Sequence, residues 1–397
     1  MATLLNEIRG FSSSGTTANI DNHVFRAYYI FTTGLLLVAT SILITSQFFG
    51  DPIDCIASND YSRSDSAKKS IDNFCWVSAT YTVNELYATN QRIGLDKLED
   101  GIGQFIPNFN TQRFQLYYRW TSLLLIIQAV LAYIPHYFWK SWESGKMEGL
   151  STMLNIPVEP TLDTDRRRTR VQLLLDYFEA FETNAHEYYT YRLYLCEYAN
   201  FVFLLVNVWL TNWVTDGLFW SLGPDIFKNG YHSIVLIKLF PSQGKCTWRV
   251  TGPSGNVQPF DALCVLPLNS FNKVIFSTLW FWYLILAVIT LGWLIFRAST
   301  IFHRVRSSLL KWKACPVNYS NHQHPEGTDC VDNICKFLPH ADWFVLLQLV
   351  DNVDTVAIKS ILGGYCERIR HLQRRRRSTH MISADEKPLL ILEHETR

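Results

Sequence analysis

The sequence has little charge for its length and no excess of either sign. Only 18% of the 397 residues are charged, and 36 Lys and Arg are balanced by 35 Asp and Glu. This balance gives no whole-chain argument for binding nucleic acid, which favours a basic surface. Aromatic residues instead make up 14% of the chain and include 13 Trp. Such a composition is typical of a membrane protein with sizeable water-exposed parts.

A secretory signal is lacking as well. Residues 1–26 contain no apolar run of signal-peptide length followed by a cleavage site. We therefore expect the first membrane span to act as an uncleaved anchor. Catalytic patterns are also missing, because the sequence shows no Ser-His-Asp spacing, no phosphate-binding loop and no pair of carboxylates on a span. We expect neither enzyme activity nor a cofactor.

One group of residues near the C-terminus has the chemistry of a zinc site, namely Cys315, His322, His324, Cys330, Cys335 and His340. A structural zinc site needs four converging ligands, commonly supplied as close pairs. The closest cysteine pair, Cys330 and Cys335, has four residues between its members, and no second cysteine pair accompanies it. We therefore expect no metal site.

Long apolar segments are what the sequence has in abundance. The segment 116–138 is ionisable only at Arg119 and His136, near its ends, apart from its tyrosines. As a helix it is long enough to cross a hydrocarbon core of about 30 Å. Three further segments meet the same test, at 27–49, 193–213 and 274–296. The sequence thus predicts an all-α membrane protein with four transmembrane helices.

The distribution of basic residues predicts the orientation of these spans, since cytoplasmic flanks are enriched in Lys and Arg. The flanks on the side of the termini carry Arg26, Lys140, Lys146, Arg192, Arg297, Arg304, Arg306 and Lys311. The opposite flanks carry Arg63, Arg113, Lys228 and Lys273. We therefore expect cytoplasmic termini, with 1–26, 139–192, 297–372 and a flexible tail 373–397 inside the cell. The loops 50–115 and 214–273 then face outward.

Cysteine placement agrees with this orientation. Each outward loop holds two cysteines, which are Cys55 and Cys75 in the first and Cys246 and Cys264 in the second. The other five lie in the third span or the cytosolic regions. An oxidising exterior favours disulfides among the first four, and four cysteines allow three pairings. A bridge between the loops would join them into one extracellular layer.

These features together resemble a known family, the innexins, which are gap-junction proteins of invertebrates. The resemblance is carried by four spans, two cysteines in each outward loop and the sequence Gly-Asp-Pro-Ile-Asp-Cys at 50–55. The second span begins Tyr117-Tyr118-Arg119-Trp120, similar to the Tyr-Tyr-Gln-Trp signature of the family, with Arg in place of Gln. Pro135 within the second span also fits the family pattern.

The resemblance implies a channel. Subunits of the family form a hexameric or octameric ring, a hemichannel that docks with one on an adjacent cell to pass ions and small metabolites. It also implies a plasma-membrane location at gap junctions, possible mixing with other innexins and contact with membrane lipids, but no nucleic-acid partner. The disulfides that it implies are Cys55 with Cys264 and Cys75 with Cys246. A cytoplasmic dome of helices is implied as well.

The resemblance further implies a pore lined by the N-terminal segment, the first span and the start of the first outward loop. The residues that we predict there are Ala2, Asn6, Arg9, Thr33, Thr40 and Asp51. The hydroxyl side chains of the first span spread around most of a helix turning 100° per residue. Close packing between helices explains the presence of these hydroxyl groups as well as a water-filled pore does.

Two residues of the second span each have two interpretations. Arg119 is either an interfacial anchor or a partner in an ion pair. Pro135 produces either a static kink or a gating hinge. In the cytosolic region, Asp342–Ile361 has the pattern of a helix, with Asp342 as its cap and Gly363-Gly364 as its stop.

The outward loops lack a glycosylation sequence. The only Asn-x-Ser/Thr sequence is at Asn318, in the predicted cytosolic region. Bare loops favour a docked junction over an undocked hemichannel of the pannexin kind, which releases small solutes. The remaining alternative is a four-span adhesive or scaffolding protein, which predicts no conductance.

Overall fold

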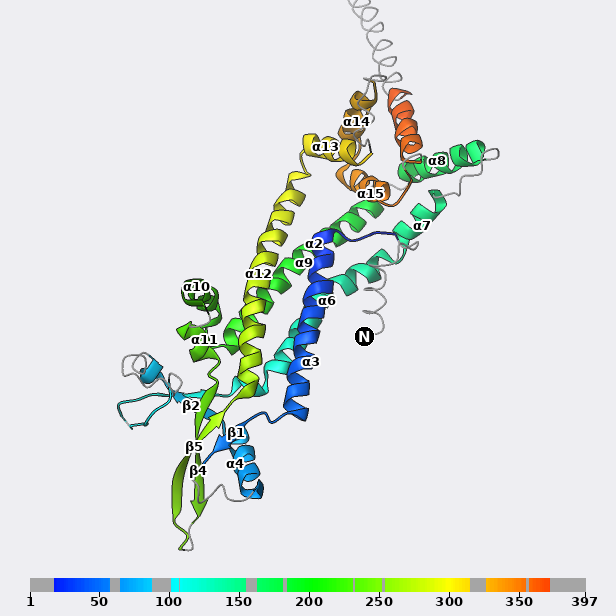
Figure 1. Cartoon of the computed structure of the whole chain (residues 1–397). Coiled ribbons are helices and arrows are strands. Elements are labelled where there is room, and N and C mark those ends of the chain that lie inside the picture. The colour runs from blue at the N-terminus through cyan, green and yellow to red at the C-terminus, as the bar shows by residue number, and fades with distance from the viewer. Residues whose placement is uncertain are drawn as a thin grey trace, which may run out of the picture. The chain divides into compact units, whose positions relative to one another are not determined.

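The computed structural model describes residues 18–57, 65–87, 101–106, 108–154, 163–180, 184–230, 233–251, 254–314, 326–354 and 357–371 (Figure 1). The predicted pore residues Ala2, Asn6 and Arg9 and the tail 373–397 lie outside these residues. The chain divides into two compact units. Unit 1 comprises Met1–His23, His136–Tyr198 and Gly292–Arg397, and unit 2 comprises Val24–Pro135 and Ala199–Leu291.

Within the described residues, four helices are long and apolar enough to cross a membrane, which confirms the predicted four-span class. They are His23–Phe49, Thr121–Glu143, Ala185–Val214 and Pro267–Ser299. The first contains α2 (His23–Arg26), the π-helix η1 (Ala27–Thr32) and α3 (Thr33–Phe49). The others belong to α6 (Thr121–Glu143), α9 (Asn184–Val214) and α12 (Pro267–Ser299).

The second span starts later than the hydropathy pattern predicts. Residues Gln112–Gln115 form strand β3, and Tyr117–Arg119 form a short 3₁₀ helix, η3. Helix α6 follows at Thr121. The apolar run therefore begins before the helix, where Tyr117 and Tyr118 pack into unit 2 and Leu116 is exposed.

The interior of unit 2 is an apolar cluster shared by the long helices. It includes Leu36 of α3, Leu125 of α6, Leu204 of α9 and Phe276 of α12. The short helices α10 (Phe219–Asn229) and α11 (Ile234–Leu239) also contribute buried side chains to this cluster.

Glycine is needed where α10 meets α12. A Cβ atom at Gly223 would lie 2.3 Å from ring atoms of Trp280, far closer than carbon atoms normally approach. The missing side chain therefore lets the Trp280 ring lie against the α10 backbone.

Unit 2 also contains a five-stranded sheet, which the sequence reading did not predict. Its strands are β1 (Asp54–Ile56), β2 (Thr80–Val83), β3 (Gln112–Gln115), β4 (Gln243–Thr251) and β5 (Val257–Val265). The order is β1-β5-β4-β2-β3, and neighbouring strands are antiparallel. We call these strands the disulfide sheet. Helix α4 (Asp65–Ser78) packs against it.

The described part of unit 1 is helical. Its shorter helices are α7 (Lys146–Leu154), α8 (Asp163–Ala180), α13 (His303–Ala314), α14 (Glu326–Phe337), α15 (His340–Val350) and residues 357–371. Helix α15 is buried almost all round, with Trp343, Phe344 and Leu346 in the core. The predicted single helix Asp342–Ile361 is therefore wrong, because residues 351–354 leave the helix.

The predicted roles of two sites in this region are also corrected. Asp342 lies in the first turn of α15, where its carboxylate is 2.6 Å from His186 Nδ1, and Pro339 is the N-cap. Gly363 and Gly364 lie inside the helix 357–371 instead of ending it. A Cβ at Gly364 would lie 2.6 Å from Leu175 Cδ1, so the glycine permits close packing on α8.

Unit 1 contains a disulfide where we expected thiols. Cys330 of α14 is bonded to Cys366 of the helix 357–371. The two helices lie side by side, which brings the two sulfur atoms together. The cysteines are 36 positions apart in the sequence, so the sequence alone does not predict this contact. Cys196 and Cys335 are buried free cysteines.

Candidate functional site

Two disulfides join the cysteine-bearing loops into one body. Cys55 on β1 lies directly opposite Cys264 on β5 and is bonded to it. Cys75 on α4 is bonded to Cys246 on β4. These are the pairs that the family resemblance implies. All four side chains are fully buried, so the bridges form part of the core beneath the disulfide sheet.

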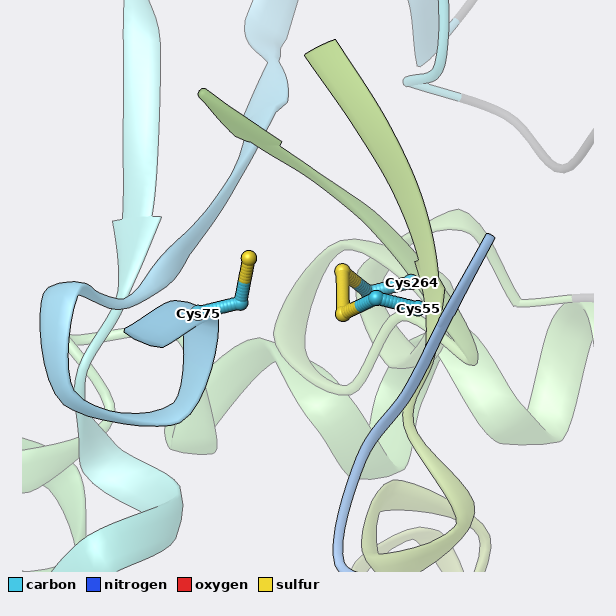
Figure 2. Close-up of side chains that lie close together, drawn as sticks. All are labelled: Cys55, Cys75 and Cys264. Atoms are coloured by element: carbon cyan, nitrogen blue, oxygen red, sulfur yellow. A yellow bond between two sulfur atoms is a disulfide. The ribbon is translucent and has the colours of Figure 1, made fainter. Parts of the chain in front are cut away.

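The sulfur atoms are close enough to resemble a metal centre. Ligand atoms of Cys55, Cys75 and Cys264 all lie within 4.8 Å of one another. Figure 2 shows the Cys55–Cys264 bond with the Cys75 sulfur beside it. A metal binds the thiolate form of cysteine. Because each of these sulfurs belongs to a disulfide, the group has no thiolate to offer in this state.

Polar contacts complete the attachment between β1 and α4. The Cys55 backbone N–H donates to Asp72 Oδ1 at 2.8 Å. Burial raises the pKa of Asp72, although this hydrogen bond acts in the opposite direction. The contact fixes β1 against the helix that carries Cys75, one helical turn further along.

A second set of contacts crosses strands β4 and β5. Lys245 Nζ lies 2.8 Å from Asp261 Oδ2, and Thr247 donates a hydrogen bond of 2.8 Å to the same carboxylate. Burial tends to raise the pKa of Asp261, but the hydrogen bonds from Lys245 and Thr247 outweigh it and hold the pKa below its ordinary value. The carboxylate therefore remains ionised at neutral pH.

The first span exposes a different face from the predicted one. Thr33 and Thr40 are buried inside the subunit, and Thr40 Oγ1 donates to Leu36 O at 2.7 Å. A side chain enclosed by its own subunit cannot face a channel, so assigning these two threonines to a pore wall is corrected. The exposed stripe of α3 instead carries Val38, Ser41, Ile42, Thr45, Phe48 and Phe49. Asp51, which follows the helix, is exposed as predicted for a loop residue.

The tyrosines of the second-span signature connect the disulfide sheet to the helices of unit 2. Tyr118 is buried, and its ring centroid lies 4.7 Å from that of Trp76 on α4. Tyr117 contacts Phe240, with 5.4 Å between ring centroids. Burial raises the pKa of both tyrosines, so their hydroxyl groups stay neutral. Their arrangement indicates a structural role in joining two parts of unit 2.

The other signature residues have separate positions. Trp120 is exposed at the start of α6, which suits a ring at a membrane interface. Arg119 is half-buried, and in the described ranges no carboxylate forms an ion pair with it, which favours the anchor interpretation. Pro135 is buried within α6.

A polar network joins the spans inside unit 2. The Gln128 side chain of α6 donates to Asn207 O at 3.1 Å and Thr211 Oγ1 at 2.7 Å, both on α9. Tyr283 of α12 donates to Gln128 at 3.2 Å, and Asn207 donates to the Tyr28 hydroxyl at 3.4 Å. Buried amides on apolar helices are expected to face neighbouring helices. The sequence position of Asn207 predicted this orientation, but not its partners.

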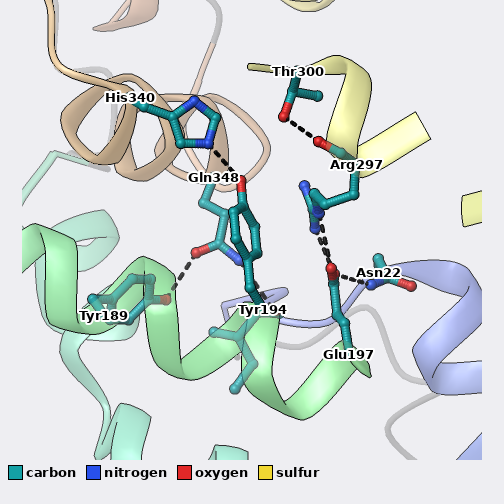
Figure 3. A network of polar contacts seen from close by, with 9 residues as sticks. Asn22, Tyr189, Tyr194, Glu197, Arg297, Thr300, His340 and Gln348 are labelled. Carbon is teal, nitrogen blue, oxygen red and sulfur yellow. Dashed lines mark hydrogen bonds and ion pairs between the residues drawn. The ribbon is translucent and has the colours of Figure 1, made fainter. Parts of the chain in front are cut away.

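An ion pair connects α9 with α12 within unit 1. Arg297 Nε and Nη2 donate to the two carboxylate oxygens of Glu197 at 2.9 and 2.5 Å. Both side chains are largely buried. The guanidinium also lies over the rings of Tyr194, Trp293 and Phe344, at 4.9 to 5.2 Å. Figure 3 shows the pair within a larger polar network. Sequence reasoning noted Glu197 but missed Arg297 as its partner.

The chain just before the first span is attached to this network. We call residues 19–22 the anchor segment. Asn22 Nδ2 donates to Glu197 at 2.5 Å, and Ile20 O accepts from Gln348 Nε2 at 3.1 Å. Asn19 exchanges hydrogen bonds with the side chain of Asn352. These contacts fix the residues that follow the N-terminal segment against α9, α15 and the turn after α15.

These observations define a multi-pass membrane protein whose two cysteine-bearing loops form one cross-linked sheet. The family model for Innexin matches residues 21–369. Innexin inx2 of Schistocerca americana is 35% identical over 360 residues, covering 88% of this chain and 93% of the relative. Innexin inx2 of Drosophila melanogaster is 34% identical, covering 87% and 90%. Innexin shaking-B of Drosophila melanogaster is 31% identical, covering 94% and 97%. The chain belongs to the innexin family of gap-junction channel proteins.

Proposed function

We propose that the chain assembles into a hexameric or octameric hemichannel, which docks with a hemichannel of an adjacent cell to pass ions and small metabolites. The observation that carries this proposal is the disulfide sheet. Two bridges join loops far apart in sequence into one body. A preorganised surface loses less conformational entropy on association than two free loops would. The cross-linked loops therefore suit end-to-end docking.

The orientation is part of the proposal. Cytoplasmic termini are supported by the excess of Lys and Arg at the span ends on that side. A reducing cytosol would keep Cys330 and Cys366 as thiols, whereas the exterior would keep Cys55, Cys75, Cys246 and Cys264 oxidised. The orientation is tested by lysing cells in the presence of an alkylating reagent and identifying the labelled cysteines by mass spectrometry. Among these six cysteines, we expect label on Cys330 and Cys366 only. Label on Cys55 or Cys246, with Cys330 and Cys366 bonded, would contradict the orientation.

The pore wall follows from the exposed face of the first span. We assign Ser41 and Thr45 of α3 to the pore, together with Asp51 and the N-terminal residues Ala2, Asn6 and Arg9. Hydroxyl groups are present on the exposed stripe of α3, whereas the exposed stripe of α6 carries Leu123, Ile126, Ile127 and Val130. An apolar stripe suits lipid, and a stripe that contains hydroxyl groups suits water or a neighbouring subunit.

Cysteine accessibility separates the revised wall from the earlier prediction. A charged thiol reagent applied to open channels should reduce conductance in Ser41→Cys or Thr45→Cys. Thr40→Cys is the matched control on the same helix, and its conductance should remain unchanged because the side chain is buried. If the reagent blocks only Thr40→Cys, the pore is lined by the face of α3 that carries Thr40, and the assignment of Ser41 and Thr45 is wrong.

An undocked hemichannel is the second candidate, and the absence of a glycosylation sequence from both cysteine-bearing loops favours docking over it. Dye transfer between paired expressing cells, compared with dye uptake by single cells, separates the two functions. Transfer without uptake supports a docked junction, and uptake without transfer supports a hemichannel acting alone. The absence of both would favour an adhesive or scaffolding role. Counting subunits in images of purified particles determines the ring size.

A further inference from the structure

A cavity of about 360 Å³ lies within unit 1, next to the end of the fourth span. It is lined by His303, Arg304, Ser307, Ser308 and Lys311 of α13 and by Asp332 and Lys336 of α14. Every lining residue is polar, and three are Arg or Lys. This volume is within the range of small-molecule sites, about 300–1,000 Å³. The lining chemistry favours an anion.

The one carboxylate of the cavity is already occupied. Asp332 lies 2.8 Å from Lys311 Nζ and accepts a hydrogen bond from Ser307. These contacts, with Lys311 the largest cause, lower the pKa of Asp332, so the carboxylate stays ionised and neutralises one cation. In the described part of the chain, neither Arg304 nor Lys336 has a carboxylate within ion-pair distance. Lys336 also attracts this carboxylate at longer range. Because three cations face one carboxylate, the cavity keeps a net positive charge for a ligand.

The position of the cavity relates it to the membrane surface. Ile295 and Phe296 are exposed on the last turns of α12, as expected for side chains that face lipid. Helix α12 ends at Ser299, and α13 begins four residues later at His303. Arg304 is therefore close, along the chain, to the end of the fourth span.

Exposed apolar side chains flank the cationic cavity. Ile301 is 69% exposed and Phe302 is 67% exposed, immediately before α13. Trp312 is 73% exposed and lies two helical turns beyond Arg304. Large apolar side chains exposed beside unpaired cations are typical of segments that lie at a membrane interface. Water alone offers no favourable partner for Ile301 and Phe302.

We propose that this cavity binds the phosphorylated headgroup of an anionic membrane lipid, with Arg304 and Lys336 contacting its phosphates. Ile301 and Phe302 pack on the acyl chains of the same leaflet. The inference relies on the proposed cytoplasmic orientation, because that leaflet carries the anionic lipids. A phosphorylated inositol lipid has the multiple charges that two unpaired cations require. The site would connect the end of the fourth span to the lipid composition of the membrane.

The test measures binding of dioctanoyl phosphatidylinositol bisphosphate to the full-length protein in mild detergent. We expect Arg304→Gln/Lys336→Gln to bind this lipid roughly 30-fold more weakly, from about 1 kcal/mol for each removed charge. Arg304→Lys/Lys336→Arg keeps both charges and should retain most of the binding. The matched control, Lys146→Gln/Arg168→Gln, removes two exposed charges outside the cavity and should bind normally.

A second pair of measurements distinguishes lipid from a soluble phosphate compound. Ile301→Ser/Phe302→Ser should weaken binding of the lipid but leave binding of free inositol trisphosphate unchanged. Equal affinity for both ligands, unaffected by this variant, would overturn the lipid assignment in favour of a soluble polyphosphate. Wild-type binding by Arg304→Gln/Lys336→Gln, or an equal loss in the control, would overturn the site itself. The lipid site is tested by binding, whereas the channel proposal is tested by dye transfer. A failure of either proposal can therefore be told apart from a failure of the other.

Discussion

The disulfide sheet of unit 2 and the contact between α9 and α12 in unit 1 are stabilised by different means. In the sheet, two buried disulfides connect short strands from distant parts of the chain. In unit 1, α9 and α12 are connected by the buried Glu197–Arg297 pair. A disulfide restricts the unfolded chain, whereas a buried ion pair depends on complete hydrogen bonding in the folded one.

This difference matches what the disulfide sheet is proposed to do. A docking surface needs one fixed shape, and covalent bonds supply it. The region around the anchor segment is held by reversible hydrogen bonds, which can be rearranged without breaking a covalent bond. The following predictions test the comparison from the largest expected effect to the smallest.

Removing one partner of the buried ion pair should have the largest effect. Glu197→Ala leaves the Arg297 guanidinium buried without its carboxylate, and we expect a loss of about 3–5 kcal/mol in unfolding free energy. Asp351→Asn is the matched control, since it breaks the more exposed Lys313–Asp351 pair and should cost at most about 1 kcal/mol. Thermal unfolding in detergent measures both. Equal shifts in the two variants would contradict the comparison.

Removing a bridge of the disulfide sheet should follow. Cys75→Ser/Cys246→Ser is expected to lower unfolding free energy by about 2–5 kcal/mol and to abolish dye transfer. Cys196→Ser removes a buried free thiol without breaking a bond, so it should be milder and retain dye transfer. Junctions that persist at normal strength in the double variant would show that the sheet does not need this bridge.

The contact between α10 and α12 should be sensitive to one methyl group. Gly223→Ala places a Cβ against the Trp280 ring, which should cost about 1–3 kcal/mol through overpacking. Gly292→Ala is the matched control in a long helix, where the new methyl group meets no neighbouring atom within 4 Å. It should be neutral or slightly stabilising, because alanine favours helix. Comparable unfolding temperatures for both variants would contradict this close approach.

Acid should weaken the disulfide sheet slightly. The lowered pKa of Asp261 means that its folded-state contacts stabilise the sheet above the ordinary Asp pKa of about 4. This contribution is lost as pH falls through the lowered value. Since Asp261 is about half exposed, we expect only a few tenths of a kcal/mol. Asp261→Asn should unfold at a lower temperature than wild type at pH 6, and the gap should close below pH 4. A constant gap would exclude this cause.

The sequence predicted the four spans because a long apolar run has few alternatives to a membrane helix. The strands were missed because β1 pairs with β5 across more than two hundred residues, and no local pattern contains such a pairing. The disulfide pairs came from family resemblance, since spacing alone left three choices. Gly363 and Gly364 were misjudged because packing against α8 outweighed the tendency of glycine to end a helix.

The face of the first span was predicted least well. Rotation at 100° per residue assumes an α-helix throughout, but Ala27–Thr32 form a π-helix. A π-turn holds more residues and changes the direction in which later side chains point. Burial of Thr33 and Thr40 also depends on neighbouring helices, which hydroxyl content does not specify.

Junctional conductance between two cells that both express this chain tests the central claim most directly. If the chain forms a gap-junction channel, current passes from one cell to the other. The current should disappear when one cell of the pair expresses neither this protein nor a compatible innexin. Paired cells with surface-exposed protein and no junctional current would contradict the account.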